Sequence, residues 1–502
     1  MLRTSSYTIY VDLPGNQEEM LVVQGYTGAY DKVSRRVATY LRSKEVKNPP
    51  KPLYGDWTPE PAIDGEVISP SQATIELLKR RGYLTEQTVE QEEAYFVELA
   101  TRLHHFQRRL MPHYVFMPTY SCNLRCAYCF QDHMRTDPAY QHLLRIMQPE
   151  MVDRIFAAMP KIEAAHGVPE DADVVRDITF FGGEPLLTEN RPIIEYTINK
   201  ALSLGKARFS AITNGTDLEA YQDLIGPDKI SYLQITVDGP AKVHDDRRIY
   251  ADGSGSFDKI ARNIDMALGA GAYVGARMSV DRDNIDQLPK LADEIIARGW
   301  NRHSNFSAYT TPIHAANSNT DIKKTFTSWD LDRALEKLHK ESSNMRVMSR
   351  PNSDGLMDRA RLLFGGNDPL PNFKASFCGA HSKMYLLDPF GDIYACWERT
   401  GDAKVRIGHI NEDSEVILNE ELNQTWRNRT VVSNPVCRKC RYSFACGGGC
   451  AVLAMNHKGK FHTNYCDGFA NRFRALVAEA YLENIVAQEV RKEKKQEQVC
   501  TS

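Results

Sequence analysis

The chain has 502 residues, which is too long for one compact domain. Its 42% hydrophobic and 25% charged residues are ordinary for a globular protein, and no run of about 18 apolar residues could cross a membrane. The net charge of −3 gives no electrostatic argument for binding nucleic acid or an anionic membrane. Eleven cysteines, in a chain that begins without the apolar segment of a signal peptide, indicate metal ligands and a reduced, cytoplasmic setting.

The first 90 residues are predicted to form a small module of strands and helices. Apolar spacing and turn residues predict strands over 7–13 and 20–23 and helices over 34–41, 71–84 and 90–109. A loop rich in proline, lysine and glycine covers 44–64. The pattern over residues 1–90 resembles the RiPP recognition element, a winged-helix-like module that captures leader peptides by adding a strand to its sheet edge. The alternative is a structural extension with no binding role.

Three cysteines stand close together after the next predicted strand. Cys122, Cys126 and Cys129 have the spacing C-x3-C-x2-C, and Tyr128 precedes the last of them. Three thiolates on one loop can hold three irons of a [4Fe–4S] cluster and leave the fourth open for chemistry, whereas four thiolates make a closed electron-transfer site. A zinc site with a distant fourth ligand is the alternative, but zinc motifs usually pair two C-x2-C units. The spacing therefore favours an iron–sulfur centre.

This cysteine loop resembles the signature of the radical S-adenosylmethionine (SAM) enzymes. The resemblance implies that SAM chelates the open iron and that one-electron reduction cleaves it to methionine and a 5′-deoxyadenosyl radical. That radical would abstract a hydrogen atom from substrate, while the protein positions and shields the cofactor. The resemblance also implies a reducing partner such as flavodoxin or ferredoxin.

From residue 114 onward, predicted strands and helices alternate. The strands cover 114–119, 177–181, 208–213, 232–238, 274–280 and 305–309, and the helices cover 149–165, 191–204, 217–226, 256–269 and 286–298. This order predicts a parallel sheet with outer helices. Six such units match the partial (β/α)6 barrel of the resembled family, whose sites lie at the carboxyl ends of the strands.

Several predicted strand ends carry residues that suit a SAM site. The second strand ends in Phe180-Phe181-Gly182-Gly183-Glu184-Pro185, where glycines would permit close backbone approach to a ligand. This run resembles the family motif that contacts the SAM amino group, and later segments resemble the peptide-maturing branch. The resemblance implies SAM contacts at Tyr128, Gly182, Gly183, Glu184, Asn214, Thr236, Arg248 and Arg277, with Ser279 a further candidate.

The assignment within the run His244-Asp245-Asp246-Arg247-Arg248 rests on spacing. The spacing selects Arg248 as the partner of the SAM carboxylate, because a guanidinium offers two parallel donors, and Arg247 is the competing candidate. We expect His244 and Asp245 to be structural turn residues.

A second set of cysteines follows the predicted barrel. It has the pattern C-x12-G-x4-C, a gap, C-x2-C-x5-C-x3-C, a gap and C, and its members are Cys378, Cys396, Cys437, Cys440, Cys446, Cys450 and Cys466. A zinc ribbon is the alternative for Cys437 and Cys440 alone. The full pattern resembles the SPASM domain, which holds two auxiliary [4Fe–4S] clusters and would bring the total to three.

The resemblance to the SPASM domain also implies which cysteines share a cluster. It assigns Cys437, Cys440, Cys446 and Cys466 to a distal cluster and Cys378, Cys396 and Cys450 to a nearer one. No cysteine lies between Cys129 and Cys378, so the nearer cluster would have an open iron or a non-cysteine ligand. Cys500 is given no role.

The predicted organisation is an α/β chain of five segments. They are a leader-recognition module over 1–90, a linker helix over 91–112, a radical SAM partial barrel over 113–345, a SPASM domain over 346–470 and a C-terminal helix and tail over 471–502.

The predicted function is maturation of a ribosomally made precursor peptide (a RiPP) through an intramolecular thioether or carbon–carbon crosslink. In sulfatase maturases an Asp follows the G-x4-C cysteine and acts as base, whereas here Trp397 follows Cys396 and Glu398 comes next. A sulfatase-type or quinone-cofactor maturase is the alternative enzyme. An iron–sulfur electron carrier or a leader-binding scaffold is the alternative non-enzyme. The sequence names neither the precursor nor the residues joined.

Overall fold

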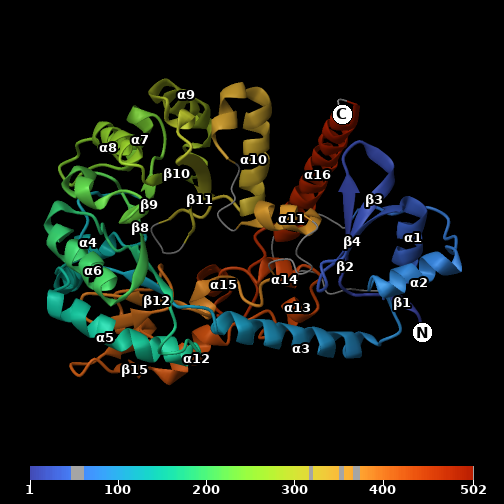
Figure 1. Cartoon of the computed structure of the whole chain (residues 1–502), viewed down its shortest axis with the longest axis horizontal. Coiled ribbons are helices and arrows are strands. Elements are labelled where there is room, and N and C mark those ends of the chain that lie inside the picture. The colour runs from blue at the N-terminus through green and yellow to red at the C-terminus, as the bar shows by residue number, and fades with distance from the viewer. Residues whose placement is uncertain (47–60, 316–319, 350–354, 366–372, 501–502) are drawn as a thin grey trace. The chain divides into compact units, whose positions relative to one another are not determined.

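The computed structural model describes residues 1–46, 61–315, 320–349, 355–365 and 373–500, with side chains as far as residue 490 (Figure 1). Its contacts divide the chain into two compact units, each formed from segments far apart in sequence. The smaller unit comprises Met1–His105, Asn352–Phe377 and Arg429–Ser502, and the larger comprises Phe106–Pro351 and Cys378–Asn428. Among the described helices, none is long and apolar enough to cross a membrane.

The larger unit is built on a ten-stranded sheet in the order β11-β10-β9-β8-β7-β6-β12-β13-β14-β15. Its six predicted strands are all present and parallel, and they are β6 (His113–Phe116), β7 (Val175–Phe180), β8 (Lys206–Thr213), β9 (Ile230–Thr236), β10 (Tyr273–Val280) and β11 (Phe306–Pro312). This sheet confirms the predicted partial barrel.

Four further strands extend the barrel sheet beyond β6. The sequence did not predict β12 (Met384–Leu387), which pairs in parallel with β6. Three short antiparallel strands follow it, and these are β13 (Asp392–Tyr394), β14 (Gly408–Ile410) and β15 (Val416–Leu418). Residues 384–418 of the predicted SPASM segment therefore continue the sheet of the larger unit.

Helices cover the outside of the barrel strands (Figure 1). The helices of the larger unit are α4 (His133–Thr136), α5 (Pro149–Ala165), α6 (Arg191–Leu204), α7 (Ala241–Arg247), α8 (Phe257–Gly269), α9 (Leu288–Arg298), α10 (Ser328–Glu341) and α12 (Glu420–Arg427). The helix predicted over 217–226 is a 3-10 helix, Leu218–Leu224. Helix α8 shows why these segments pack on the sheet, because Ile260, Ile264 and Leu268 recur at helical spacing and are buried.

The smaller unit contains a three-stranded antiparallel sheet in the order β2-β3-β4 and a short pair, β1 with β5. The strands are β1 (Arg3–Thr4), β2 (Thr8–Leu13), β3 (Asn16–Gln24), β4 (Tyr30–Ser34) and β5 (Leu84–Thr85). The third sheet strand, β4, was missed because its polar, half-exposed residues lack an apolar run. The loop predicted over 44–64 lies mostly outside the described residues.

The helices of the smaller unit come from both ends of the chain. They are α1 (Arg35–Ser43), α2 (Gln72–Arg80), α3 (Val89–Arg108), α11 (Leu356–Phe364), α13 (Pro435–Arg438), α14 (Ser443–Cys446), α15 (Ala451–Lys458) and α16 (Phe469–Cys500). Helices α1 and α2 are each preceded by an N-cap serine, Ser34 and Ser71, whose side chain accepts a hydrogen bond from a first-turn N–H.

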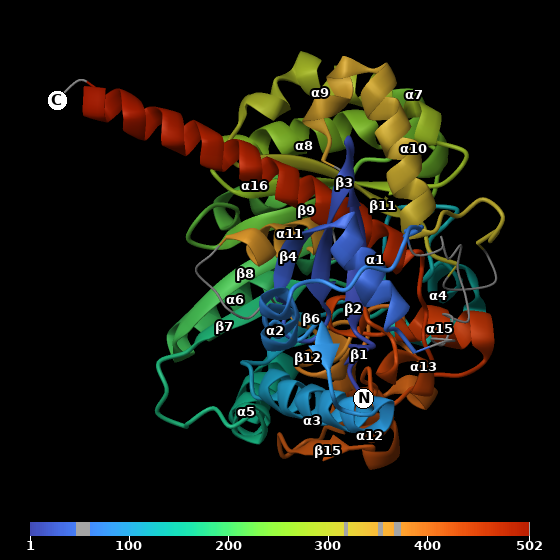
Figure 2. The ribbon, with the colours of Figure 1, turned by 90° about the vertical axis from the view of Figure 1, so that its right-hand side faces the viewer.

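The two ends of the chain share one hydrophobic core in the smaller unit. Val11 and Leu21 from the N-terminal sheet belong to the same buried cluster as Phe473 and Val477 of α16, and Figure 2 shows α16 running beside these strands. The Tyr7 ring also stacks on Phe96 at a centroid distance of 4.7 Å. Deleting residues 1–90 would therefore remove part of a shared core, so the predicted boundary at residue 90 does not mark a separable piece.

Candidate functional site

The three cysteines of the predicted cluster site lie on the loop that follows β6, at the carboxyl end of the parallel strands. Cys122, Cys126 and Cys129 are free thiols in a tight turn in which the Cys129 N–H donates to the Cys126 carbonyl at 3.0 Å. Burial raises the pKa of Cys122 to about 12 and also raises that of Cys126. We call these three residues the cysteine loop.

The cysteine loop opens into a cavity of about 460 Å³ at the strand ends. All the predicted SAM-contacting side chains and glycines contribute to its lining, together with residues that the sequence did not single out. The lining includes Tyr128, Gly182, Gly183, Glu184, Asn214, Thr236, Arg248, Arg277, Ser279, Arg135, Phe181, His314, Trp397 and Glu398. The fold thus gathers side chains from seven separate strand ends or loops around one space.

The two glycines after β7 let this segment pack closely against the backbone of another part of the protein, as well as leaving room for a ligand. A Cβ on Gly183 would lie 2.2 Å from the Ser121 carbonyl oxygen and 2.3 Å from that of Tyr120. A Cβ on Gly182 would lie 2.4 Å from the Thr119 carbonyl oxygen. The glycines are therefore needed to seat the segment that leads directly into Cys122.

Glu184 is fully enclosed and joins two strand ends. Its carboxylate accepts hydrogen bonds from the Thr213 hydroxyl and the Asn214 N–H, both at 2.6 Å, and from the Leu186 N–H at 2.9 Å. Burial raises the pKa of Glu184 to about 7, and these hydrogen bonds only partly offset that effect. A carboxylate has about four acceptor positions, so one remains for a ligand ammonium group.

Asn214, just after β8, and Arg277, on β10, approach the cavity from the two sides of β9. The Asn214 side-chain amide donates to Asn123 Oδ1 at 2.9 Å and lies 3.8 Å from Cys122 Sγ. Arg277 lies directly beside Thr236 in the register of β10 and β9, and its buried Nε has no hydrogen-bond partner among the described residues. This unpaired Nε–H is available to an acceptor atom of a ligand in the cavity.

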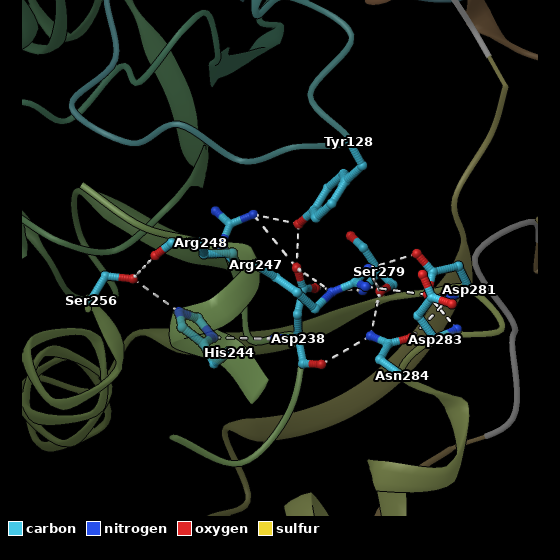
Figure 3. Close-up of polar contacts among 10 residues, drawn as sticks. All are labelled: Tyr128, Asp238, His244, Arg247, Arg248, Ser256, Ser279, Asp281, Asp283 and Asn284. Atoms are coloured by element: carbon cyan, nitrogen blue, oxygen red, sulfur yellow. Dashed lines mark hydrogen bonds and ion pairs between the residues drawn. The ribbon is translucent and has the colours of Figure 1, made fainter. Parts of the chain in front are cut away.

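Tyr128, Asp238 and Arg248 form a buried polar network beside the cysteine loop (Figure 3). The Tyr128 hydroxyl donates a short hydrogen bond to Asp238 Oδ2 and accepts one from Arg248 Nη1 at 2.6 Å. Asp238 Oδ1 accepts the Ser279 N–H at 2.9 Å, and no part of the Asp238 side chain is exposed. The network fixes a guanidinium in the cavity wall, where Arg248 suits a carboxylate.

The competing candidate, Arg247, is already engaged. Its two terminal nitrogens contact the Asp281 carboxylate at 3.2 and 3.0 Å, and it does not line the cavity. His244 Nδ1 lies 3.3 Å from the Asp238 N–H, while Asp245 accepts the N–H groups of Ser256 and Phe257 (Figure 3 shows His244 and Ser256). Burial lowers the pKa of His244 well below its ordinary value. The geometry therefore favours Arg248 over Arg247 and gives His244 and Asp245 structural contacts.

The far part of the cavity carries residues from β11 and from the segment after Cys396. Phe181 and Trp397 meet edge to face at a centroid distance of 5.0 Å. His314 Nδ1 lies 3.6 Å from Glu398 Oε1, and Glu398 Oε2 is buried with no hydrogen-bond partner among the described residues. Sequence reasoning noted Trp397 and Glu398 but missed Phe181 and His314, whose only signal was their place just past a strand end.

The cysteines assigned to the distal cluster lie together in the smaller unit, and we call Cys437, Cys440, Cys446 and Cys466 the distal cysteines. Amide groups approach two of their sulfurs, because Asn434 Nδ2 lies 3.2 Å from Cys437 Sγ and Asn464 Nδ2 lies 3.0 Å from Cys466 Sγ. Cys378 and Cys396 belong to the larger unit and Cys450 to the smaller. Their joint ligation of a nearer cluster therefore remains a prediction.

Comparison with known proteins identifies the chain. Residues 116–295 match the family model described as the Radical SAM superfamily. Mycofactocin maturase MftC of Mycolicibacterium smegmatis is 25% identical over 348 residues, which cover 66% of this chain and 76% of that protein. A cysteine-type anaerobic sulfatase-maturating enzyme of Clostridium novyi is 22% identical over 376 residues, covering 71% of this chain and 93% of that protein.

A solved structure shares the fold over nearly the whole chain. SuiB of Streptococcus suis, bound to the precursor peptide SuiA, superposes with a TM-score of 0.50 at 14% identity, covering 93% of this chain and 99% of that one. With the sequence matches, this places the chain in its class: it is a radical SAM enzyme. Within that class it belongs to the SPASM-type peptide maturase family.

The cavity suits the cofactors that this family uses. Three thiols without a fourth cysteine on the same loop fit a cluster with one open iron, and Arg248 and Glu184 offer partners for the carboxylate and ammonium groups of SAM. Within the described residues no three Cys, His, Asp or Glu side chains converge to hold a single metal ion. Assignment of SAM and a [4Fe–4S] cluster rests on the family and on this donor set.

Proposed function

We propose that this enzyme matures a ribosomally made precursor peptide carrying a leader, and that it forms an intramolecular thioether or carbon–carbon crosslink. The observation that carries the proposal is Trp397, which occupies the cavity wall where a sulfatase maturase would be expected to carry its basic Asp. An indole has no basic group for proton removal, whereas it shields a reactive carbon from water. The similarity to SuiB, which was solved bound to the precursor peptide SuiA, supports a peptide substrate.

Different residues of the cavity would carry out different parts of such a reaction. When bound, the reduced cluster and SAM supply a 5′-deoxyadenosyl radical that takes one hydrogen atom from a substrate carbon. Arg248, oriented by Tyr128 and Asp238, holds the SAM carboxylate. Phe181 and Trp397 close the apolar side of the cavity against water.

Ring closure must then remove one proton and one electron from the peptide. The buried Glu398 Oε2, which has no partner among the described residues, is placed to accept the proton. We propose that Cys378, Cys396 and Cys450 would hold an auxiliary [4Fe–4S] cluster, which would supply an acceptor for the electron. Counting the hydrogen atom taken first, the product is two hydrogens lighter than the precursor.

The second auxiliary cluster would be held by the distal cysteines and would pass electrons onward. An external carrier such as flavodoxin or ferredoxin would supply the electron that starts each cycle. Four thiolates close a cluster to exogenous ligands, which suits transfer and not substrate chemistry.

The leader is proposed to bind at the free edge of the N-terminal sheet. Strand β4 is an outer strand of the β2-β3-β4 sheet, and its residues are half-buried or exposed. An edge strand presents unpaired N–H and C=O groups that an extended peptide can pair with. Because the first 90 residues share a core with α16, the test uses the full chain: the precursor should slow amide hydrogen exchange over 30–34. Unchanged exchange there, with a leaderless core peptide as control, would refute leader docking at β4.

Tandem mass spectrometry of the matured peptide tests the crosslink. We expect a product two hydrogens lighter, with fragmentation suppressed inside the ring and no reaction with hydrazides. The chain with Cys122, Cys126 and Cys129 all changed to Ala serves as the inactive control. A hydrazide-reactive product would instead establish the sulfatase-type alternative, which similarity to the Clostridium novyi enzyme and the nearby Glu398 favour. An epimer of unchanged mass would overturn both.

A further inference from the structure

One arginine beside the cysteine loop has no part in the predicted SAM contacts. Arg135 lies on α4, the short helix that follows the loop, and its side chain is only 3% exposed. Its Nη2 lies 3.1 Å from Cys129 Sγ, which is hydrogen-bond distance to a cysteine that the cluster would use. Its Nε and Nη1 are buried with no hydrogen-bond partner among the described residues.

The charge of Arg135 is poorly compensated by protein carboxylates. The ion pair found for it joins Nη2 to Asp132 Oδ1 at 3.7 Å, and the Asp132 side chain is 29% exposed. Arg248, which also lies near the loop, instead has the buried Asp238 carboxylate at 3.9 Å and the Tyr128 hydroxyl at 2.6 Å. A buried cation is costly unless a counter-charge is present, so Arg135 is placed for an anion that the fold itself does not provide.

Two hydrogen bonds to backbone groups of Arg135 keep the residue beside Cys129 Sγ. Its N–H donates to the Asp132 carbonyl at 3.0 Å, and its own carbonyl lies 3.4 Å from the Gln141 side-chain amide. Three ligating thiolates bring negative charge to this spot, and reduction of a cluster adds one further electron. Cations and hydrogen bonds to cluster sulfurs stabilise the reduced state and so raise the reduction potential.

We propose that Arg135 is a positioning residue that sets the reduction potential of the cluster on the cysteine loop. Its charge and its N–H···S contact with Cys129 make the cluster easier to reduce by one electron from a low-potential donor. SAM cleavage depends on that electron, so Arg135 would control how much of the enzyme reaches the reduced state with a given carrier. No bond to Arg135 forms or breaks.

The test is a redox titration of the anaerobically reconstituted full chain with dithionite, followed by electron paramagnetic resonance and without SAM. The chain with Cys122, Cys126 and Cys129 changed to Ala gives the auxiliary signals to subtract. Arg135→Gln should lower the equilibrium constant for reduction about tenfold, which is about 59 mV for a one-electron couple. Arg135→Lys keeps the charge but not the planar donor, and its potential should fall between the two.

Arg125→Gln is the matched control, because it removes the same charge from the same loop. The Arg125 guanidinium donates to the carbonyls of Cys122 and Leu124 at 2.8 and 3.0 Å, not to a sulfur. The reduction potential of the cluster in Arg125→Gln should stay near that in the unchanged chain. An unchanged potential in Arg135→Gln, or an equal shift in Arg125→Gln, would overturn the proposal.

Two further readouts separate other roles for Arg135. Iron content shows whether the cluster is retained, and loss of iron from both Arg135 variants would mean that the residue holds the cluster and does not tune it. Isothermal titration shows whether SAM binds. Weaker SAM binding with an unchanged potential would assign Arg135 to SAM and refute its redox role.

Discussion

The cysteine loop and the distal cysteines hold their sulfurs in different surroundings. A guanidinium from Arg135 faces the first set, whereas neutral amides from Asn434 and Asn464 face the second. The cysteine loop lines a cavity large enough for a ligand. Backbone packs closely beside the distal cysteines, because Gly449 has a positive φ and a Cβ there would lie 1.8 Å from the Tyr465 carbonyl oxygen. One region is thus built to exchange ligands and the other to remain closed.

The largest expected effect comes from removing each cysteine set in turn. Changing Cys122, Cys126 and Cys129 to Ala should abolish SAM cleavage and remove one cluster, about four irons per chain. Changing Cys437 and Cys440 to Ala should leave reductive SAM cleavage but stop maturation of the precursor. Iron analysis and chromatography of 5′-deoxyadenosine measure both, with Cys500→Ala as the control. Loss of SAM cleavage in the Cys437 and Cys440 variant alone would show that the two cysteine sets do not have separate roles.

Glycine substitutions sharpen the comparison because each region depends on close backbone packing. Gly183→Val should deplete iron from the cysteine loop and abolish SAM cleavage, since its side chain would collide with the carbonyls of Tyr120 and Ser121. Gly449→Ala should deplete iron from the distal cysteines and leave SAM cleavage in place. Gly269→Ala meets nothing within 4 Å and controls for the added methyl group. A Gly183→Val chain with full iron content would show that the glycine serves SAM alone.

A smaller effect is expected from the arginine pair after β9. Arg248→Ala removes a charged hydrogen-bond donor to the SAM carboxylate, worth about 2 kcal/mol or about thirtyfold in affinity. Arg247→Ala should change SAM affinity much less, because Arg247 pairs with Asp281 outside the cavity lining. Calorimetric titration of SAM distinguishes them. The reverse order of effects would assign the SAM carboxylate to Arg247.

The smallest expected effect is a pH dependence of SAM binding through Glu184. Burial raises the pKa of this carboxyl to about 7, so it is ionised above that pH and neutral below it. The SAM ammonium group prefers the ionised form, so affinity should fall as pH drops through about 7, by up to about tenfold per unit. Glu184→Gln should bind SAM more weakly with a flatter profile. An equally steep profile in Glu184→Gln would place the titrating group elsewhere.

The sequence by itself determined the barrel and the chemistry of its opening loop. The pattern of apolar residues predicted the six barrel strands, β6 to β11, because each strand and helix buries a locally encoded face. The spacing of Cys122, Cys126 and Cys129 predicted the iron–sulfur site, because three ligands on one short loop must lie together in any fold. The glycine run 182–183 was recognised for the same local reason.

Only the tertiary structure decided which distant residues complete the site. Arg135 and His314 carry no pattern in the sequence, and they reach the cavity because separate loops end at one edge of the sheet. The pairing of β12 with β6, and the core that Val11 shares with Phe473, also join segments hundreds of residues apart. Such contacts satisfy burial and hydrogen bonding in three dimensions, and no local run of residues records them.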